Sequence, residues 1–306
     1  MTKPKIVVVG SSNTDMIIKA DRIPAPGETV VGGSFATAPG GKGANQAVAA
    51  ARAGGDVVFV ARVGDDMLGK QAIEGYVKEG IDVSLIQRDP QLATGVALIM
   101  VDSTGDNSIS VASGANFALT PEDVERASDA IKDAKMVVFQ LESPLDAIQR
   151  AAKLAKAAGV PVLLDPAPAP AEPLPQEILE CVTVVKPNET EAARLTGIEV
   201  VDEATARAAA EKLLELGVQI AIVTLGSAGS YVATKDGVRK SVPAMRVDAV
   251  DATAAGDAYS GALAVALAEG KTLDDALAFA SKAAALSVQK LGAQPSLPTR
   301  EEIERA

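Results

Sequence analysis

Short apolar segments and longer amphipathic segments alternate along most of this sequence. Runs such as Val137-Val138-Phe139 are rich in β-branched and aromatic residues and have the length of buried strands. The segments between them repeat small apolar residues at helical spacing. Because this alternation is typical of helices that cover a sheet, it predicts an α/β fold with a mostly parallel central sheet.

The bounds of these elements follow from the pattern. We expect strands over Lys5–Val9, Val57–Val63, Gly95–Val101, Met136–Leu141, Val160–Asp165, Val182–Lys186 and Gln219–Thr224. We expect helices over Gly43–Ala53, Leu68–Glu79, Pro121–Asp133, Pro144–Ala158, Glu189–Leu195, Glu203–Leu216, Asp257–Ala268, Leu273–Val288 and Thr299–Arg305.

Two stretches, at about 13–38 and 94–113, interrupt the alternation. The first holds two short strand-like runs, Met16-Ile17-Ile18 and Thr29-Val30-Val31. The second reads as a hairpin that turns at Thr104-Gly105-Asp106-Asn107. We predict that both stretches form one small sheet, a lid over a single domain that spans 1–306. The proline-rich segment 165–175 is predicted to be a rigid loop.

The residue types that the chain lacks restrict its chemistry. It has no histidine and one cysteine, Cys181. A Ser-His-Asp triad, a histidine base, an intrachain disulfide and a cysteine metal cluster are therefore excluded. We expect Cys181 to be a buried small residue, because no histidine is present to activate its thiol.

Charge and hydropathy restrict the partners. The net charge of −11 and the absence of a basic stripe argue against nucleic acid. The apolar run Ile6–Val9 is too short to be a signal or membrane segment. We therefore expect a cytoplasmic protein without a membrane partner.

Two glycine-containing motifs open predicted helices. Gly40-Gly41-Lys42-Gly43 either turns backbone amides toward a ligand or forms a simple helix-capping turn. It is not a Walker A loop, since Gly43 occupies the Ser/Thr position. In Ala254-Ala255-Gly256-Asp257, the amides of 254–257 would form an anion hole and Asp257 would act as a base. The alternative is an aspartate that stabilises a helix N-terminus.

Further polar residues follow predicted strands, where open α/β sheets bind ligands. Asn188 and Glu191 share a helix face and could hold Mg²⁺ with waters, or could be an acidic first helical turn. The turn 224–229 could cradle phosphates or join two strands. Asn13 and Asp15 could bind sugar hydroxyls or be a solvated turn. Glu142 follows another strand in the same way.

The order and spacing of these motifs resemble the ribokinase group of the PfkB carbohydrate kinase family from end to end. The motifs that carry the resemblance are Asn13-Thr14-Asp15, Gly40–Ala47, Leu141–Pro144, Pro187–Glu191, Ala254–Asp257 and Gly292–Ser296. The resemblance implies a ribokinase-like three-layer fold and an ATP-dependent carbohydrate kinase. It further implies phosphorylation of the 5-hydroxyl of D-ribose by a homodimer that pairs through its lids.

The resemblance also implies a role for each matching position. The implied catalytic set is Asp257 as general base, with Ala254, Ala255 and Gly256 in the anion hole. The implied sugar-binding set is Asn13, Asp15, Gly41, Lys42, Asn45, Glu142 and Asp257. The implied ATP-binding set is Asn188, Glu191, Thr224, Gly226, Ser227, Gly229, Gly256 and Ser281.

Two cations are implied in the same way. Mg²⁺ would be held by Asn188 and Glu191 through water. A monovalent cation, usually K⁺, would be held by Asp251, Thr253, Ser287, Lys290, Gly292 and Ser296. The sequence departs from the family pattern at Ala254, where other branches have glycine, and at Ser281, where some members place a histidine beside adenine.

Other functions remain as alternatives. Another sugar or nucleoside kinase of the family could act on deoxyribose, fructose or a keto-deoxy sugar acid. Aromatic residues make up only 3% of the chain, which disfavours a stacked nucleoside acceptor. A non-catalytic sugar sensor is a second alternative, against which Asp257 and the Asn188–Glu191 pair argue. An NAD-linked oxidoreductase is excluded, because no GxGxxG follows the first strand.

Overall fold

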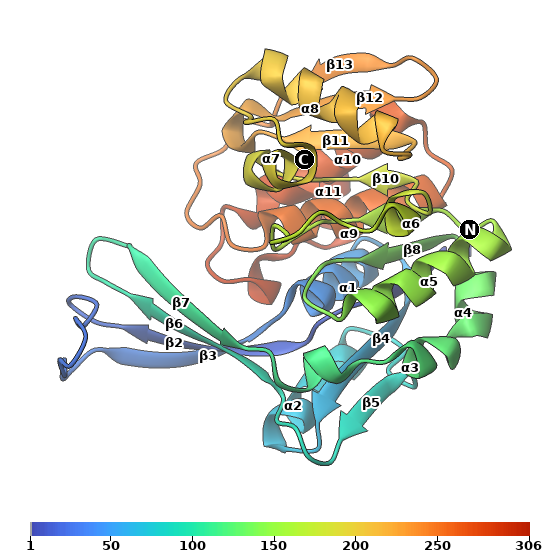
Figure 1. The fold of residues 1–306 in the computed structure, drawn as a ribbon. Helices are drawn as coiled ribbons and strands as arrows, with labels where there is room; N and C mark the ends of the chain where they lie inside the picture. Colours follow the sequence, from blue (N-terminus) through green and yellow to red (C-terminus); the bar gives the residue numbers. More distant parts are fainter. Residues whose placement is uncertain (1) are drawn as a thin grey trace.

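A nine-stranded sheet forms the centre of the computed structural model, which describes residues 2–306 (Figure 1). Its strand order is β13-β12-β11-β10-β9-β8-β1-β4-β5. All neighbours are parallel except the pairs β11–β12 and β12–β13. The strands are β1 (Lys5–Val9), β4 (Asp56–Gly64), β5 (Ile86–Asp89), β8 (Met136–Phe139), β9 (Val162–Leu164), β10 (Val184–Val185), β11 (Ile220–Thr224), β12 (Ser230–Thr234) and β13 (Arg239–Val242).

Helices bury both faces of this sheet, so the fold has three layers. In β1, Ile6 and Val8 pack into the core on one face, and Val7 and Val9 pack into the core on the other. The first core lies under α1 (Lys42–Arg52), α2 (Met67–Lys78), α9 (Ala255–Ala268), α10 (Leu273–Ser287) and α11 (Arg300–Arg305). The second lies under α3 (Pro121–Glu125), α4 (Ser128–Asp133), α5 (Leu145–Ala158), α6 (Gln176–Leu179), α7 (Glu189–Thr196) and α8 (Glu203–Glu215). The predicted α/β fold is confirmed.

Helices α1 and α9 pack against each other unusually closely, because small residues line their contact. A Cβ built on Gly261 would lie 2.5 Å from the Ala49 Cβ atom. The segment Asp257–Ala266 of α9 is buried at every position. This contact fixes the start of α9 beside the start of α1, which positions the site described below.

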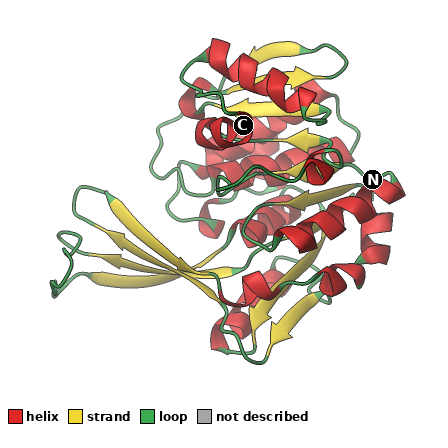
Figure 2. Cartoon of the chain, viewed as in Figure 1, coloured by secondary structure: helices red, strands yellow, loops and turns green. Residues whose placement is uncertain are grey.

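A second sheet of four strands projects from the three-layer body as an arm (Figure 2). Its order is β3-β2-β6-β7. The strands are β2 (Asn13–Lys19), β3 (Ser34–Gly40), β6 (Gly95–Val101) and β7 (Asn107–Ala112). The predicted hairpin in 94–113 is present as β6 and β7. We call this four-stranded sheet the lid sheet.

Register assigns the residues of the lid sheet to its two faces. Asp15 is paired with Ala97, which is paired in turn with Val111, so these side chains share one face. Ile18 and Phe35 are paired and share the opposite face. The Asp15 carboxylate lies beside Gly40 and near Glu142 of the body, so its face of the sheet is turned toward the body there and the Phe35 face is turned away.

One predicted lid strand is wrong. Thr29-Val30-Val31 is a loop in which Val31 is 92% exposed, and the strand lies at Ser34–Gly40 instead. The loop continues through Gly32 and Gly33, whose positive φ angles of 112° and 94° do not fit a strand. The true strand escaped prediction because it is a mostly exposed edge strand that contains a proline.

Other element bounds were also incorrect. The helix expected over 121–133 is divided, because Ala127 leaves helical geometry and its N–H donates to the Val124 carbonyl. The strands β5, β12 and β13 were not predicted. The segment 165–175 is a loop, as predicted, and Cys181 is buried. Within residues 2–306, no helix is both long enough and apolar enough to cross a membrane.

Candidate active site

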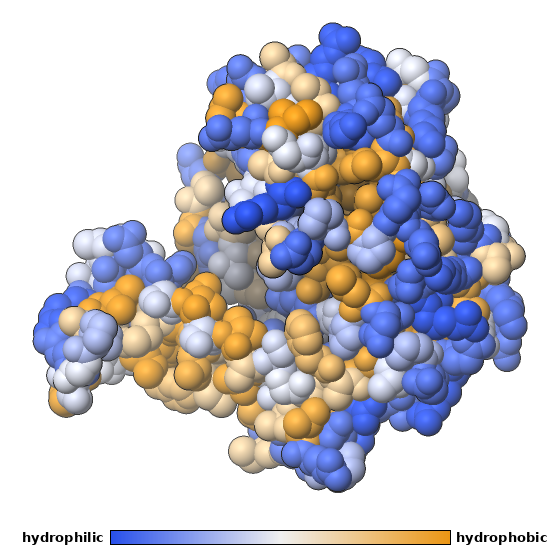
Figure 3. All heavy atoms as spheres, viewed as in Figure 1, coloured by the Kyte–Doolittle hydropathy of each residue, from blue (hydrophilic) through white to orange (hydrophobic). Residues whose placement is uncertain are grey.

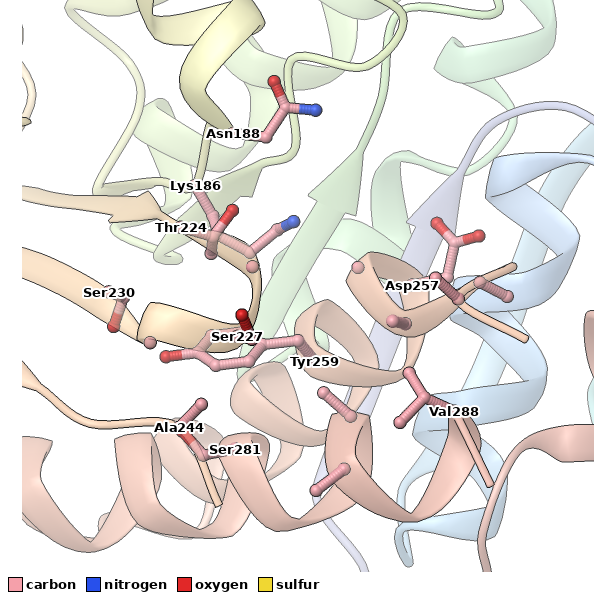
Figure 4. Close-up of a pocket in the computed structure, with 18 of the residues that line it drawn as sticks. Lys186, Asn188, Thr224, Ser227, Ser230, Ala244, Asp257, Tyr259, Ser281 and Val288 are labelled. Atoms are coloured by element: carbon pink, nitrogen blue, oxygen red, sulfur yellow. The ribbon is translucent and has the colours of Figure 1, made fainter. Parts of the chain in front are cut away.

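A cleft of about 930 Å³ lies beyond the carboxyl ends of the parallel strands β9, β10 and β11. Its wall includes the first turn of α9, the turn after β11 and one side of α10. Figure 4 shows Asp257 at one end of this cleft and Ser230 and Ala244 at the other. Parallel strands present their connecting loops at this edge, so side chains from distant segments meet here.

Asp257 is buried and tied to α1. One carboxylate oxygen accepts a hydrogen bond from Asn45 Nδ2 at 2.9 Å, and the other accepts one from Gln46 Nε2 at 2.9 Å. Burial raises the pKa of Asp257, and the nearby Asp165 raises it further, although Lys42 and the two amides oppose the shift. A buried carboxylate that keeps hydrogen-bond partners is suited to accept a proton near neutral pH.

The first turn of α9 presents free backbone donors next to this carboxylate. Ala254 has a φ of 61°, which is the left-handed region, and ends the preceding loop abruptly. The amides of Gly256 and Asp257 have no hydrogen-bond acceptor within residues 2–306. The Ala255 amide donates to the Ala252 carbonyl at 3.2 Å, so the predicted run of free amides at 254–257 is interrupted. Free amides at a helix N-terminus are suited to bind an anion.

The predicted sugar-binding residues lie together at the junction of the lid sheet and α1. Glu142 Oε2 accepts hydrogen bonds from the Lys42 amide at 2.9 Å and from Ser11 Oγ at 2.5 Å. Asn13 is buried, and its Oδ1 accepts a hydrogen bond from Asn116 Nδ2 at 2.7 Å. Asp15 lies beside Gly40, where an added Cβ would come within 2.3 Å of its carboxylate.

Backbone contact explains the glycines of this junction. A Cβ on Gly41 would lie 2.7 Å from the Asn13 amide, and Gly41 has a φ of 90°. A Cβ on Gly43 would lie 2.4 Å from the Ser11 amide. Only glycine allows the start of α1 to approach the β1–β2 connection this closely. The motif therefore has a structural role in placing Lys42 and Asn45, whether or not its amides bind a ligand.

The charged groups at this junction influence one another. Burial raises the pKa of Asp15 to about 6, and the adjacent Glu142 contributes to the rise. Burial would lower the pKa of Lys42, but the carboxylates of Asp257, Asp165 and other nearby acids outweigh it and raise the pKa. Lys42 therefore stays positively charged between the acidic groups of this junction and those of the cleft.

Asn188 and Glu191 form a helix-capping box. The Glu191 amide donates to Asn188 Oδ1, and the Asn188 amide donates to Glu191 Oε2, both at 2.9 Å. The spacing Asn-x-x-Glu predicts this arrangement, which sequence reasoning overlooked. Burial raises the pKa of Glu191, with Asp165 adding to the rise. Both residues border the cleft. The capping box uses only one carboxylate oxygen of Glu191, so the other oxygen is available to a ligand.

The turn after β11 lines the other end of the cleft. The predicted residues Thr224, Gly226, Ser227 and Gly229 all border it, as does Ser281 from α10. The turn also joins the antiparallel strands β11 and β12, which confirms its strand-joining role, and a role in binding phosphates stays a prediction. Gly229 has a φ of 101°, and an added Cβ would lie 2.1 Å from the Val242 carbonyl oxygen. The Tyr259 ring lies across this region (Figure 4).

The loops proposed for a monovalent cation are joined by Asp251. Its carboxylate accepts hydrogen bonds from the Thr253 amide at 2.9 Å and the Gly292 amide at 2.8 Å. Burial opposes ionisation, but these hydrogen bonds outweigh it and lower the pKa of Asp251. The hydroxyls of Ser287 and Ser296 donate to carbonyls of their own turns, Ala284 and Ala293, respectively. The Lys290 side chain pairs with Glu302 at the surface.

Sequence reasoning missed a buried polar network beside Asp257. Asp165 Oδ2 accepts hydrogen bonds from Gln46 Nε2 and Ser260 Oγ, each at 2.9 Å, and pairs with Lys186 Nζ at 3.2 Å. Asp165 and Lys186 each follow a strand end, and these strands, β9 and β10, are neighbours. Each residue is the last one of its predicted strand, so their equivalent positions could have indicated that they meet. Sequence reasoning placed both at strand ends and gave neither a role in the site.

Comparisons with known proteins identify the family of this chain. The model of the pfkB family of carbohydrate kinases matches residues 3–300, and the chain belongs to this family. It is 43% identical to a ribokinase of Haemophilus influenzae over 297 residues, which cover 97% of this chain and 96% of the relative. It is 39% identical to a deoxyribokinase of Salmonella typhi over 298 residues, 97% of each chain.

A solved structure confirms the fold. The structure of Arabidopsis thaliana ribokinase complexed with ribose and ATP matches with a TM-score of 0.91 and 37% identity. The match covers 99% of this chain and 98% of that chain. The fold is therefore the ribokinase-like α/β fold with a separate small sheet, as the motifs predicted.

Proposed function

We propose that this chain is an ATP-dependent kinase that phosphorylates the 5-hydroxyl of D-ribose. The observation that carries the proposal is the position of Asp257. Its buried carboxylate lies between a junction rich in hydroxyl-binding groups and a cleft of nucleotide size, beside free amides of α9. Relatives along the full chain are ribokinases, which supports ribose as the acceptor.

The mechanism follows from the position of each group. Ribose would bind at the junction, where Asn13, Asp15 and Glu142 offer fixed acceptors for its hydroxyls. Asp257 would accept the proton of the 5-hydroxyl as that oxygen attacks the terminal phosphorus of ATP. The free amides of Gly256 and Asp257 would stabilise the negative charge of the phosphoryl group during transfer.

The ATP-binding part of the proposal rests on the cleft. Its phosphate end is bordered by Gly256, Asn188 and Glu191, and its far end by Ser281 and Ala284. The far end is lined mainly by small and apolar residues, which suits a nucleobase. An enzyme that consumes ATP needs a compartment that supplies it, and we propose the cytoplasm.

Both proposed cations fit the donor groups present. Glu191 keeps one carboxylate oxygen outside the capping box, so it and Asn188 could hold Mg²⁺ through waters. Mg²⁺ would supply charge neutralisation at the ATP phosphates. For K⁺, Asp251 already joins the two loops that carry Thr253 and Gly292, and backbone carbonyls of these loops are suitable ligands.

The lid sheet supports a proposal about assembly. Its outer face carries Ile18, Phe35 and Leu98, which are 41%, 63% and 55% exposed. Figure 3 shows hydrophobic side chains along this arm. A contiguous apolar patch on an exposed sheet is typical of a protein interface. We propose that two copies pair through this face, with each lid covering its own site.

Turnover of D-ribose with ATP and Mg²⁺, measured as ADP release, tests the proposed function. Asp257→Asn should lower kcat by about 10³-fold or more while ribose affinity is kept, because an amide cannot accept the proton. Asp146→Asn, at an exposed helix end, is the matched control. Near-normal turnover by Asp257→Asn would contradict the base assignment.

A substrate panel decides between the candidate acceptors. The deoxyribokinase relative is nearly as similar as the ribokinases, so 2-deoxyribose is the acceptor to compare first. A higher kcat/KM for deoxyribose than for ribose would identify deoxyribose as the preferred substrate and would leave the proposed mechanism unchanged. Ribose binding without ADP release would indicate a sensor that has kept the fold.

A further inference from the structure

We propose that Lys186 is a catalytic residue whose ammonium binds the phosphoryl group in transfer, and that Asp165 is the positioning residue that holds it there. This inference rests on the proposed kinase function and adds a cation to its site. Neither residue belongs to the motifs that identified the family.

The first observation is that the pair is buried although it borders the cleft. The side chains of Lys186 and Asp165 are 4% and 3% exposed, and their charged atoms lie 3.2 Å apart. Removing two charges from water often costs more than their attraction returns, so a buried ion pair is a poor explanation for stability. A function that needs a fixed positive charge in the cleft explains the pair better.

The second observation is the position of the ammonium group. Lys186 Nζ lies 3.3 Å from the position that a Cβ on Gly256 would occupy. It is therefore beside the α9 turn that presents the free amides of Gly256 and Asp257. Figure 4 shows the Lys186 side chain extending into the cleft on the side of Asp257. An ammonium group has three donors, and Asp165 is its one ionic partner within residues 2–306, which leaves donors for a phosphate.

The third observation is that one amide joins the cation to the base. Gln46 Nε2 donates to Asp257 Oδ1 and to Asp165 Oδ2, both at 2.9 Å. Gln140 Nε2 donates to Gln46 Oε1 at 2.6 Å, which fixes the orientation of the Gln46 amide. The base, the amide, Asp165 and Lys186 thus form one buried chain of contacts. Its geometry fixes the distance between the group that accepts the proton and the group that receives the phosphoryl charge.

The chemistry of the transfer explains the need for such a cation. As the terminal phosphoryl group leaves ATP, negative charge spreads over its outer oxygens and the leaving oxygen. Two backbone amides provide partial positive charge only, whereas Lys186 provides a full charge in a site shielded from water. Lys42 borders the same cleft, and its ammonium is influenced by Asp257 and Asp165 as well as by Glu142, so it is a second cation near this site, which the variants below separate from Lys186.

Four variants test the proposal. Lys186→Met removes the cation and leaves the buried Asp165 without its ionic partner, so it is expected to lower Tm as well as activity. The double variant Lys186→Met/Asp165→Asn removes both charges and should recover much of that Tm. Asp165→Asn keeps Lys186 but removes the carboxylate that holds its ammonium group in place. Lys153→Met breaks a surface pair with Glu177 and is the matched control, with no expected change.

We expect the double variant to be folded and to have a reduced kcat. Its kcat should fall by about 10²- to 10³-fold, as when one donor of an anion hole is lost, while the KM for ribose stays near the wild-type value. Asp165→Asn should show a smaller loss of kcat. A folded double variant with wild-type kcat would overturn the proposal. Stabilisation of the phosphoryl charge would then be attributed to Lys42 and the α9 amides.

A binding measurement separates this proposal from the proposed function. Calorimetry with a non-hydrolysable ATP analogue and with ADP should show that the double variant loses affinity for the triphosphate by about tenfold more than for the diphosphate. Equal loss for both nucleotides would refute a contact at the terminal phosphate. If the wild-type chain fails to turn over any sugar, the proposed function fails, and the nucleotide comparison still decides the role of Lys186.

Discussion

Ribose binding should weaken at acidic pH because of a single carboxyl group, Asp15. Burial raises its pKa from the ordinary value of 3.8 to about 6, and Glu142 contributes to the rise. With a pKa of about 6, the group is about 99% ionised at pH 8 and only about 9% ionised at pH 5. If the carboxylate is the form that accepts hydrogen bonds from ribose hydroxyls, the Kd for ribose should rise about tenfold from pH 8 to pH 5.

The assay is calorimetric titration of the nucleotide-free chain with D-ribose across this pH range. Asp15→Asn should bind more weakly at pH 8 and show little pH dependence, because the amide does not titrate. Asp257→Asn is the second variant, since burial raises the pKa of Asp257 as well. It should keep the pH dependence if Asp15 is responsible. A flat wild-type profile, or an unchanged slope in Asp15→Asn, would refute the reasoning.

The same shift has a consequence for stability, with a definite sign. Asp15 binds its proton more tightly in the folded chain than in the unfolded chain. Its contribution therefore favours folding fully below pH 3.8 and is lost as pH rises through about 6. The side chain of Asp15→Asn does not titrate, so the variant should not lose this stability as pH rises. The Tm of the variant minus the Tm of the wild type should therefore increase from pH 4 to pH 7.

Two further predictions concern a helix cap and the proposed dimer. Asn188→Ala removes the side chain that caps α7 and should lower the free energy of unfolding by about 1 kcal/mol, whereas Asn188→Asp should keep most of it. Equal stability of Asn188→Ala and the wild type in denaturant titrations would contradict the capping role. Phe35→Glu with Leu98→Glu places two charges on the outer face of the lid sheet and should give a folded monomer in light scattering, whereas a dimer of unaltered mass would show that the copies pair elsewhere.

The body of the fold was predictable because its elements carry strong local patterns. The run Val137-Val138-Phe139 is apolar at every position, as a strand buried on both faces requires. The lid strand Ser34–Gly40 has no such pattern, since it is exposed on most of its length and holds a proline. Its position depends on pairing with β2, which no local property of the segment reveals.

The candidate site was predictable only in part, for a similar reason. Motif residues such as Asp257 and Asn45 follow glycine turns, which are visible in sequence. The hydrogen bond between them joins residues 212 positions apart and depends on the close contact of two helices. Asp165 and Lys186 carry no local signal, because their significance arises from neighbouring strands that bring the two ends into register.

The contact between α1 and α9 has a consequence for the order of assembly during synthesis. Helix α1 is complete by residue 52, but the helix that covers its Asn45 and Gln46 side begins at residue 255. Until about 200 further residues have left the ribosome, that alanine-rich surface has no native partner. Long-range contacts of this kind form late and slowly. Nascent chains should therefore need protection by chaperones over this interval, and the proposed phosphoryl-transfer centre should become ordered only after α9 has been synthesised.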